Sequence, residues 1–235
     1  MINMFVGDSH SRQFVGASYG IFCHYVFSGA TVKGLANSVS KTGHAKLIKE
    51  AVATEQEKTV FLMFGSVDLD FSLQREFCLK EEVDVEKFLT DRIDTYHAFI
   101  QSLLDAGRKS GVIKKLIVIC PQVSPLVSDN FFVQTPKHIR LDPALLKKAA
   151  QRFDISDEAR ARRVILFNDA LHGKVSDLRE VSTIRIDRQM VDENYRILGN
   201  FIPKSPIEHH AVLSQTQKLW GPILNEYITD HIIVG

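Results

Sequence analysis

Short apolar segments and longer amphipathic segments alternate along this chain. Apolar runs rich in β-branched and aromatic residues are typical of buried strands, whereas apolar positions three and four residues apart are typical of helices. Alternating strands and helices predict an α/β fold with a mainly parallel sheet of about five strands covered on both faces. The predicted strands are residues 1–6, 21–27, 59–64, 112–120 and 181–186, and the predicted helices are about 11–19, 44–53, 83–111, 145–153, 157–171 and 213–228.

Two stretches depart from this alternation. Residues 31–43 are polar and contain glycines, which predicts a loop. Residues 121–142 begin at a proline and contain two more, so we predict a long irregular loop. Its Phe131 and Phe132 are candidates for a pocket wall or for a cover over the sheet edge. No repeat, low-complexity segment or linker divides the sequence, which predicts a single domain over residues 1–235.

The composition argues against several classes of partner. The chain has 235 residues, 45% of them hydrophobic and 24% charged, which is enough for a full core. A net charge of +1 favours neither nucleic acid nor an anionic membrane. The basic surplus over residues 137–163 is typical of a solvated helical face. No apolar run approaches the ~18 residues that span a bilayer. We expect no nucleic-acid or membrane partner, and the sequence gives no indication of the oligomeric state.

Cysteine usage and the N-terminus bear on the compartment. Cys23, Cys78 and Cys120 are an odd number without the spacing of metal ligands. Cys23 and Cys120 lie in predicted strands, where buried structural thiols are expected. The N-terminus has no basic region followed by an apolar one, so we expect no secretion signal and a cytoplasmic location. No metal site and no cofactor are predicted.

Candidate chemistry begins directly after the first predicted strand, at Gly7-Asp8-Ser9. In parallel α/β sheets, ligands bind beyond the carboxyl ends of the strands. A serine at the turn from strand to helix can act as a nucleophile, and the free N–H groups of the helix start can bind a developing oxyanion. The tripeptide alone is weak evidence because turns are rich in all three residue types.

A nucleophilic serine needs a base, usually a histidine held by a carboxylate. His209 and His210 precede the last predicted helix, with Glu208 beside them. We prefer His210 as the base because it lies nearer the apolar segment that leads into the helix. His209 remains the alternative.

In their order along the chain, these segments resemble the conserved blocks of the SGNH (GDSL-like) hydrolases. Gly7-Asp8-Ser9 matches the block with the nucleophile, and Gly34 is similar to the glycine whose N–H contributes to the oxyanion hole. Gly65-Ser66-Val67-Asp68 is similar to the block that usually reads Gly-x-Asn-Asp, and residues 206–210 to the block Asp-x-x-His.

This resemblance covers essentially the whole chain. It implies a flavodoxin-like three-layer α/β/α sandwich and a serine-dependent ester hydrolase without cofactor or metal. A subgroup that has histidine after Gly-Asp-Ser is most similar, which singles out His10. Its association with polysaccharide and surface-glycan gene sets implies an acylated saccharide or another small ester as substrate, with acetyl as the first acyl group to test.

Two departures from the family pattern concern the predicted site. No aspartate stands three residues before either histidine, so Glu208 or a backbone carbonyl orients the base, or the unit is a Ser–His dyad. The usual asparagine is absent from the third block, which removes an oxyanion donor worth roughly 2.7–4 kcal/mol. Asn37 is a candidate replacement. We expect Asp68 to organise its loop by accepting backbone N–H bonds and Asp8 to stabilise its turn. His10 either packs at the helix start or binds substrate beside Ser9.

The same residues are compatible with other functions. The same site with a sugar hydroxyl as acceptor gives an O-acyltransferase, and a decayed site gives a glycan-binding protein. Asp8-x-His10 also has the spacing of a two-metal phosphoesterase motif. That interpretation requires Gly-Asn-His and Gly-His-x-His motifs, which the chain lacks.

Overall fold

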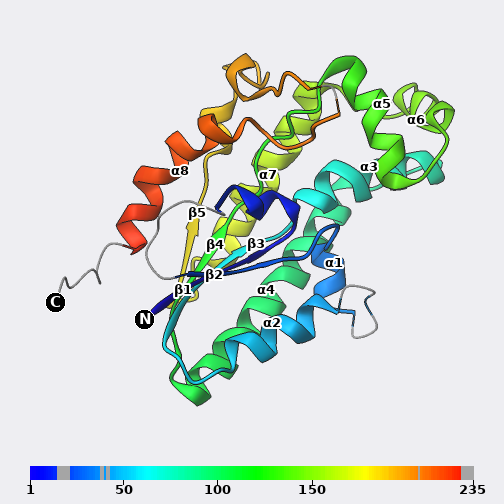
Figure 1. Cartoon of the computed structure of the whole chain (residues 1–235). Coiled ribbons are helices and arrows are strands. Elements are labelled where there is room, and N and C mark those ends of the chain that lie inside the picture. Colours follow the sequence, from blue (N-terminus) through cyan, green and yellow to red (C-terminus); the bar gives the residue numbers. More distant parts are fainter. Residues whose placement is uncertain (15–21, 38–39, 41–42, 206, 229–235) are drawn as a thin grey trace.

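The computed structural model describes residues 1–14, 22–37, 40, 43–205 and 207–228. Its centre is a sheet of five parallel strands in the order β2-β1-β3-β4-β5 (Figure 1). The predicted α/β class and parallel sheet are confirmed, and the strand order is that of the flavodoxin-like folds. The strands are β1 (Ile2–Gly7), β2 (Phe22–Val26), β3 (Lys58–Met63), β4 (Ile113–Ile119) and β5 (Val181–Ile184).

The central strands are buried on both faces. All six residues of β3 are buried, as are five of the six in β1. A parallel sheet covered by helices produces this continuous apolar pattern rather than strict alternation. The register pairs Gly7 with Met63, so β1 and β3 end at the same edge of the sheet. In this strand order, the connections diverge between β1 and β3, where such folds bind their ligands.

Helices cover the sheet, with α2 and α4 on one side and α8 on the other (Figure 1). Asp84 caps α4 by accepting the Lys87 N–H, and Ser156 caps α7 by accepting the Ala159 N–H. Helix α8 contacts the 3₁₀ turn η1 that follows β1. The helices are α1 (Val32–Leu35), α2 (His44–Val52), α3 (Leu73–Leu79), α4 (Val85–Ser110), α5 (Ser128–Ile139), α6 (Pro143–Ala150), α7 (Asp157–Val175) and α8 (Leu213–Ile228), with 3₁₀ turns η1 (Ser9–Phe14), η3 (Asp187–Met190) and η4 (Gly199–Phe201) and the π-turn η2 (Asp68–Ser72).

The prediction of a long loop at 121–142 is wrong over most of its length, because this segment contains α5. Pro136 lies in the last turns of this helix, where a missing N–H interrupts it less than at its centre. Phe131 and Ile139 turn inward and are buried. The predicted loop at 31–43 contains the short helix α1, and η2 and α3 were not expected at all.

Smaller differences concern the first helix and the cysteines. The first predicted helix, 11–19, begins as the 3₁₀ turn η1, and its residues 15–19 lie outside the described part of the chain. Cys78 and Cys120 are buried free thiols, whereas Cys23 on the edge strand β2 is half-buried.

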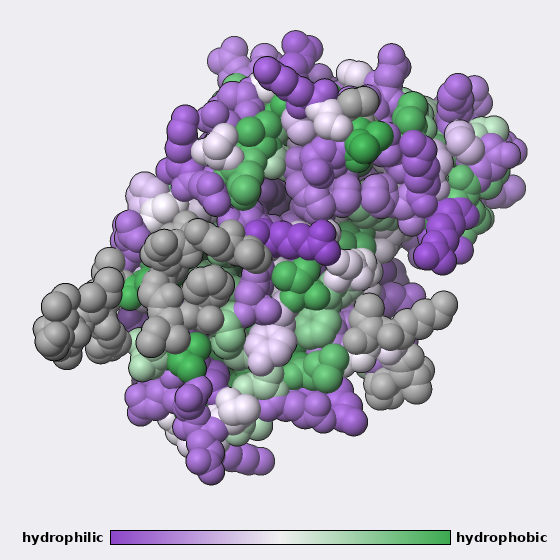
Figure 2. Space-filling view, in the orientation of Figure 1, coloured by the Kyte–Doolittle hydropathy of each residue, from purple (hydrophilic) through white to green (hydrophobic). Residues whose placement is uncertain are grey.

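The surface is mostly hydrophilic over the helices at the upper edge of the molecule, and apolar side chains gather lower, near β2 and α2 (Figure 2). Tyr25 and Leu47 are exposed apolar residues of these two elements. Among the described residues, no helix combines the length and the hydropathy needed to cross a membrane.

Candidate active site

Ser9 occupies the turn that joins β1 to η1. Gly7 closes this turn against β3, because a Cβ at position 7 would lie 2.5 Å from the Met63 carbonyl oxygen. The Asp8 N–H donates to the same carbonyl oxygen at 3.0 Å. Ser9 then starts η1, and its N–H has no hydrogen-bond acceptor among the described residues. The turn therefore presents a hydroxyl and a free amide at the ligand-binding edge of the sheet.

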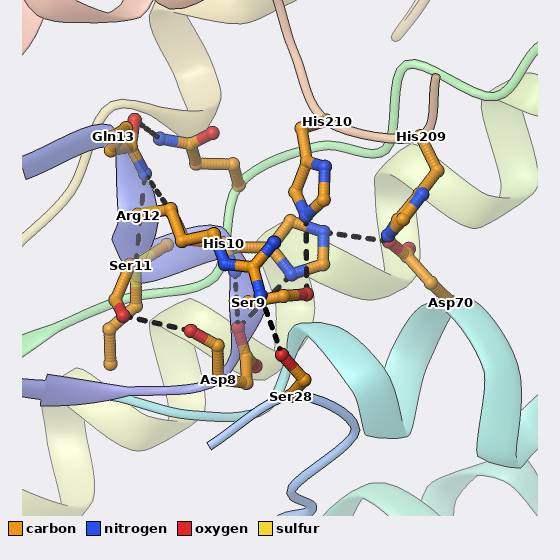
Figure 3. Close-up of polar contacts among 12 residues, drawn as sticks. Asp8, Ser9, His10, Ser11, Arg12, Gln13, Ser28, Asp70, His209 and His210 are labelled. Carbon is orange, nitrogen blue, oxygen red and sulfur yellow. Dashed lines mark hydrogen bonds and ion pairs between the residues drawn. The ribbon is translucent and has the colours of Figure 1, made fainter. Parts of the chain in front are cut away.

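His210 faces this hydroxyl from the loop before α8 (Figure 3). Its Nε2 lies 3.1 Å from Ser9 Oγ, within hydrogen-bond distance, although 201 residues separate the two. On the other side of the ring, Nδ1 lies 2.7 Å from Glu208 Oε1. With its proton on Nδ1, His210 donates to Glu208 and accepts the Ser9 hydroxyl hydrogen. This is the geometry of a serine, a base and the carboxylate that orients it.

Glu208 takes the place of the missing aspartate. The same Oε1 also accepts the His210 backbone N–H at 2.9 Å, so one carboxylate oxygen fixes both the ring and the chain. Glu208 lies only two residues before the base, and its side chain is 46% exposed. The structure thus favours Glu208 as the orienting group among the three possibilities left by the sequence, in a more solvated setting than a buried triad.

His209, the alternative base, makes no hydrogen bond to Ser9 in the described part of the chain, whereas His210 does. Its ring lies between those of His210 and His138, with centroids at 3.9 and 4.4 Å. Burial and the neighbouring histidines lower the pKa of His209 to about 3, so it is neutral at pH 7. Its role in this geometry is to pack against the base.

The environment keeps His210 neutral as well. Burial lowers the pKa of His210 below its ordinary value of 6.5, and the charge of His10 lowers it further. The Glu208 hydrogen bond and charge oppose this shift without reversing it. A neutral imidazole at pH 7 is the form that can accept a proton from Ser9.

A buried pair of carboxylates holds His10 behind the nucleophile. Asp8 Oδ1 accepts the His10 N–H at 2.9 Å, which is the turn-stabilising role expected for Asp8. The same oxygen lies 3.1 Å from His10 Nδ1, and Asp70 Oδ2 lies 3.7 Å from Nε2. Burial lowers the pKa of His10, but the charges of Asp8 and Asp70 outweigh it and the net shift is upward. Of the two roles considered for His10, the structure favours packing, with one edge on a hollow beside Ser9.

Asp68 organises its loop, as expected. It is fully buried, and Oδ2 accepts the Val32 N–H at 2.6 Å while Oδ1 accepts from Arg92 Nε at 2.9 Å. These bonds tie the start of α1 to η2 and α4. Burial raises the pKa of Asp68 to about 6, against the opposing effects of Val32 and Arg92. Asp68 does not line either of the two hollows beside Ser9.

Gly65 gives this loop its shape. Its φ is +116°, and a Cβ there would lie 2.8 Å from Pro121 Cγ, so both conformation and space require glycine. Two residues later, Val67 stands where the related block has asparagine, and its side chain lines the hollow with Ser9. The Val67 side chain therefore offers no hydrogen-bond donor to this hollow.

Gly34 and Asn37 are not brought to the site. The Gly34 N–H is engaged by Thr31, with the carbonyl oxygen and Oγ1 both at 3.1 Å. A Cβ on Gly34 would lie 2.5 Å from the His44 ring, so the close approach of His44 explains this glycine. Asn37 is exposed and lines neither hollow beside Ser9.

Gly29 is the glycine that does line the hollow with Ser9. It lies in a turn closed by a hydrogen bond from the Ala30 N–H to the Phe27 carbonyl oxygen, and its φ is +73°. Its own N–H has no acceptor in the described part of the chain. The sequence pattern favours Gly34 instead, although Gly29 lies closer to the end of β2, which is the signal that identifies it.

Ser9 lies between two hollows. The first, about 500 Å³, is bounded by the β2 turn, η2 and α5, with Gly29, Val67, Phe71 and Ile139 among its lining residues. The second, about 1060 Å³, is bounded by η1 and residues 199–215. His138 and Ile139 place the end of α5 on the first wall, whereas Phe131 and Phe132 line a separate hollow away from Ser9.

Gln13 connects the two distant segments that form the site. Its Oε1 accepts from Trp220 Nε1 at 3.0 Å and from Gln122 Nε2 at 2.7 Å. These bonds fix η1, which carries Ser9, against α8, which follows His210. Since Gln13 and Trp220 are both buried, the serine and its base share one rigid support.

Glu208, His209 and His210 each offer a ligand atom, and these atoms lie within 4.8 Å of one another. Two of the atoms, Glu208 Oε1 and His210 Nδ1, already bond to each other. A metal ion would break the contact that orients His210 toward Ser9. The arrangement therefore fits a held base better than a metal centre.

No protein-family model matches this sequence, and no curated protein does. Solved structures do match. A protein from Streptococcus pneumoniae, described provisionally as a platelet activating factor, aligns over 96% of this chain and 83% of its own, with 14% identity and a TM-score of 0.56. A protein from Slackia heliotrinireducens, described provisionally as an SGNH hydrolase, aligns over 97% of this chain and 98% of its own, with 10% identity and a TM-score of 0.53. At these identities the likeness concerns the fold, and this chain has the α/β fold of the SGNH hydrolases.

Proposed function

We propose that this protein is a serine-dependent ester hydrolase that transfers an acyl group to water. The observation that carries the proposal is the line from Ser9 Oγ through the His210 ring to Glu208, with contacts of 3.1 and 2.7 Å. The base is uncharged at neutral pH, and the hydroxyl lines two hollows that can hold a substrate. Acylated saccharides and other small esters are the proposed substrate class, with acetyl as the first acyl group to test.

The reaction follows from the geometry. Ser9 Oγ attacks the ester carbonyl carbon as His210 Nε2 takes the hydroxyl proton, and the carbonyl π electrons move onto oxygen. The free N–H groups of Ser9 and Gly29 hold this oxyanion. The carbonyl re-forms as the C–O bond to the alcohol breaks, and His210 returns the proton to the leaving oxygen. A water molecule then repeats the sequence on the acyl-enzyme and releases the acid and Ser9.

Val67 limits the stabilisation of the oxyanion. An amide donor at such a position is worth roughly 10²–10³ in kcat, and a valine side chain has no N–H to donate. Backbone N–H groups are then the main donors of the proposed site. We expect a slower enzyme than one with three donors.

The second hollow supports a related activity, an O-acyltransferase. It adjoins Ser9, is lined largely by residues 199–215 and, at about 1060 Å³, has room for an acceptor alcohol such as a sugar. A sugar hydroxyl that displaces water at the acyl-enzyme would make the protein a glycan acyltransferase. Adding increasing concentrations of a sugar to a hydrolysis assay measures this partition, since transfer yields an acylated sugar in place of free acid.

A fluorophosphonate probe tests the proposed nucleophile. We expect covalent labelling of the wild type on Ser9, seen by mass spectrometry of the labelled peptide, and none in Ser9→Ala. His210→Ala should slow labelling much more than the matched control His209→Ala, because only His210 reaches Ser9 Oγ. Labelling at another residue, or equal rates in the two histidine variants, would contradict the proposal.

A further inference from the structure

Two arginines flank the hollow of about 500 Å³ beside Ser9, and none of the described residues that line it is acidic. Arg12 comes from η1, three residues after the nucleophile, and Arg75 comes from α3. Both side chains are exposed at the rim of the hollow. Its inner wall includes Val67, Phe71 and Ile139, so the hollow combines an apolar wall with a cationic rim.

Neither arginine has a carboxylate partner in the described part of the chain. Arg12 Nη2 donates to Ser28 Oγ at 2.9 Å, a neutral acceptor, and Figure 3 shows its side chain reaching across the site toward Ser28. Arg75 makes no ion pair with any described residue. Six other arginines pair with carboxylates: Arg92, Arg108, Arg160, Arg185, Arg188 and Arg196. The remaining five have no such ion pair among the described residues either: Arg140, Arg152, Arg162, Arg163 and Arg179. Arg12 and Arg75 differ from these five in lining the hollow that Ser9 lines.

The acids closest to the site are already engaged. Asp8 and Asp70 lie behind the nucleophile, are buried, and face His10. Glu208 bonds to His210 and lines the other hollow. Among the described residues, no carboxylate therefore neutralises the two guanidinium groups that line this hollow.

We propose that this hollow takes an ester that carries an acidic group, which Arg12 and Arg75 bind while Ser9 attacks the ester carbonyl. The inference rests on the proposed hydrolase function and adds a substrate class to it. Guanidinium groups bind carboxylate, sulfate and phosphate groups through paired hydrogen bonds, so an acidic sugar ester or the half-ester of a dicarboxylic acid fits. Exposed charge pairs are individually modest, and for the two arginines together we expect about a tenfold preference.

Matched esters test this preference and identify the side of the ester that carries the charge. One pair has the acid on the alcohol: 3-acetoxybenzoate against its methyl ester. The other has it on the acyl chain: 4-nitrophenyl hydrogen adipate against its methyl ester. We expect kcat/KM to favour the anionic member of one pair about tenfold, and the preference to shrink at 0.5 M NaCl.

Arg12→Met and Arg75→Met should each reduce that ratio of anionic to neutral kcat/KM. The control is Arg179→Met, an exposed arginine that precedes β5 at the opposite edge of the sheet, and it should leave the ratio as in the wild type. If the wild type cleaves the neutral esters without preferring either anionic ester, the inference is overturned and the hydrolase function stands.

A binding measurement tests the cationic rim independently of the proposed hydrolase activity. Ser9→Ala cannot form the acyl-enzyme, so calorimetry on this variant measures the affinity for the intact preferred ester and for its neutral partner. Tighter binding of the anionic member, lost on adding Arg12→Met, supports the cationic rim even if the wild type cleaves no ester. Equal affinities for the two members overturn it.

Discussion

Glu208 differs from an ordinary triad acid in two ways, its short sequence distance from the base and its exposure. A single carboxylate oxygen, Glu208 Oε1, bonds to both the ring and the backbone N–H of His210. In a buried triad, replacing the acid by its amide lowers kcat about 10⁴-fold. Because Glu208 is 46% exposed, water can partly replace it. We predict that Glu208→Gln lowers kcat by about 10- to 1,000-fold, measured on a 4-nitrophenyl ester, with the exposed Glu86→Gln on α4 as control.

The same variant should move the pH profile. The pKa of His210 is lowered by burial and raised in part by Glu208, so wild-type kcat/KM should fall on the acid side with a midpoint below 6.5. Removing the carboxylate removes a contribution that raises this pKa, and the acid limb of Glu208→Gln should therefore lie at still lower pH. A midpoint above 6.5 in the wild type, or an unshifted limb in the variant, would argue against His210 as the base.

At the residue scale, the sequence predicts the groups that lie in short motifs. Local context and order along the chain predict Ser9, His210 and Glu208, and the structure brings these three into contact. No short motif predicts Gly29 or Asp70, because their importance comes from tertiary placement. Gly29 is important because it lines the hollow beside Ser9, and Asp70 because its carboxylate faces the buried His10 of η1.

At the scale of elements, Gly29 and Gly34 both follow β2, but glycine is required at the two positions for different reasons. At Gly29, nothing lies within 4 Å of an added Cβ, but φ is +73°, which costs a side-chain residue about 1–2 kcal/mol. At Gly34, an added Cβ would lie 2.5 Å from the His44 ring. Gly29 is thus constrained by its backbone conformation and by its free N–H, whereas Gly34 is constrained by packing against His44.

We predict opposite profiles for Gly29→Ala and Gly34→Ala. Gly29→Ala should shift the backbone N–H that binds the oxyanion, so kcat falls by about tenfold or more, while the conformational cost of about 1–2 kcal/mol lowers Tm by only a few degrees. Gly34→Ala should lower Tm more and leave kcat per folded molecule close to wild type, because its N–H is bonded to Thr31. Thermal melts and active-site titration give both quantities, and a larger kcat loss in Gly34→Ala would restore Gly34 as the donor.

Elements with regular periodicity are predictable here, and elements defined by their neighbours are not. Strand β4 and helices α4 and α8 lie at or near their predicted bounds. Helix α5 was missed because Pro136 suggests a loop, while the burial of Phe131 and Ile139 stabilises the helix. The π-turn η2 has no sequence signature of its own; buried Asp68 and Asp70 define it through their partners Arg92 and His10.

For the whole molecule, alternating strands and helices predict the parallel sheet but not its strand order. The order β2-β1-β3-β4-β5 puts β1 beside β3 and so brings the Ser9 turn against the loop at 65–70. This placement buries three ionisable groups together, Asp8, His10 and Asp70, directly behind the proposed nucleophile. Their titration links the site to the stability of the fold.

Asp70 should make the folded state less stable as pH rises. Burial raises the pKa of Asp70 from 3.8 to about 6, against the opposing charges of His10 and Arg160. Between these two values the folded state binds more protons than the unfolded state, so this group's contribution to the free energy of unfolding decreases as pH rises through that range. His10, whose folded pKa is raised, contributes stability that is fully present below 6.5 and is lost at higher pH. The two effects have the same sign.

Asp70→Asn removes the titrating carboxyl and keeps its size. We predict that the variant gains stability relative to wild type between pH 4.5 and pH 7.5, by at most about 3 kcal/mol. Urea unfolding at the two pH values gives this difference, and Asp177→Asn, an exposed aspartate after α7, is the control that should show none. A constant offset between Asp70→Asn and wild type across this range would mean that Asp70 does not titrate there. A relative loss at pH 7.5 would mean that its charge is stabilised by His10 and Arg160 more than burial penalises it.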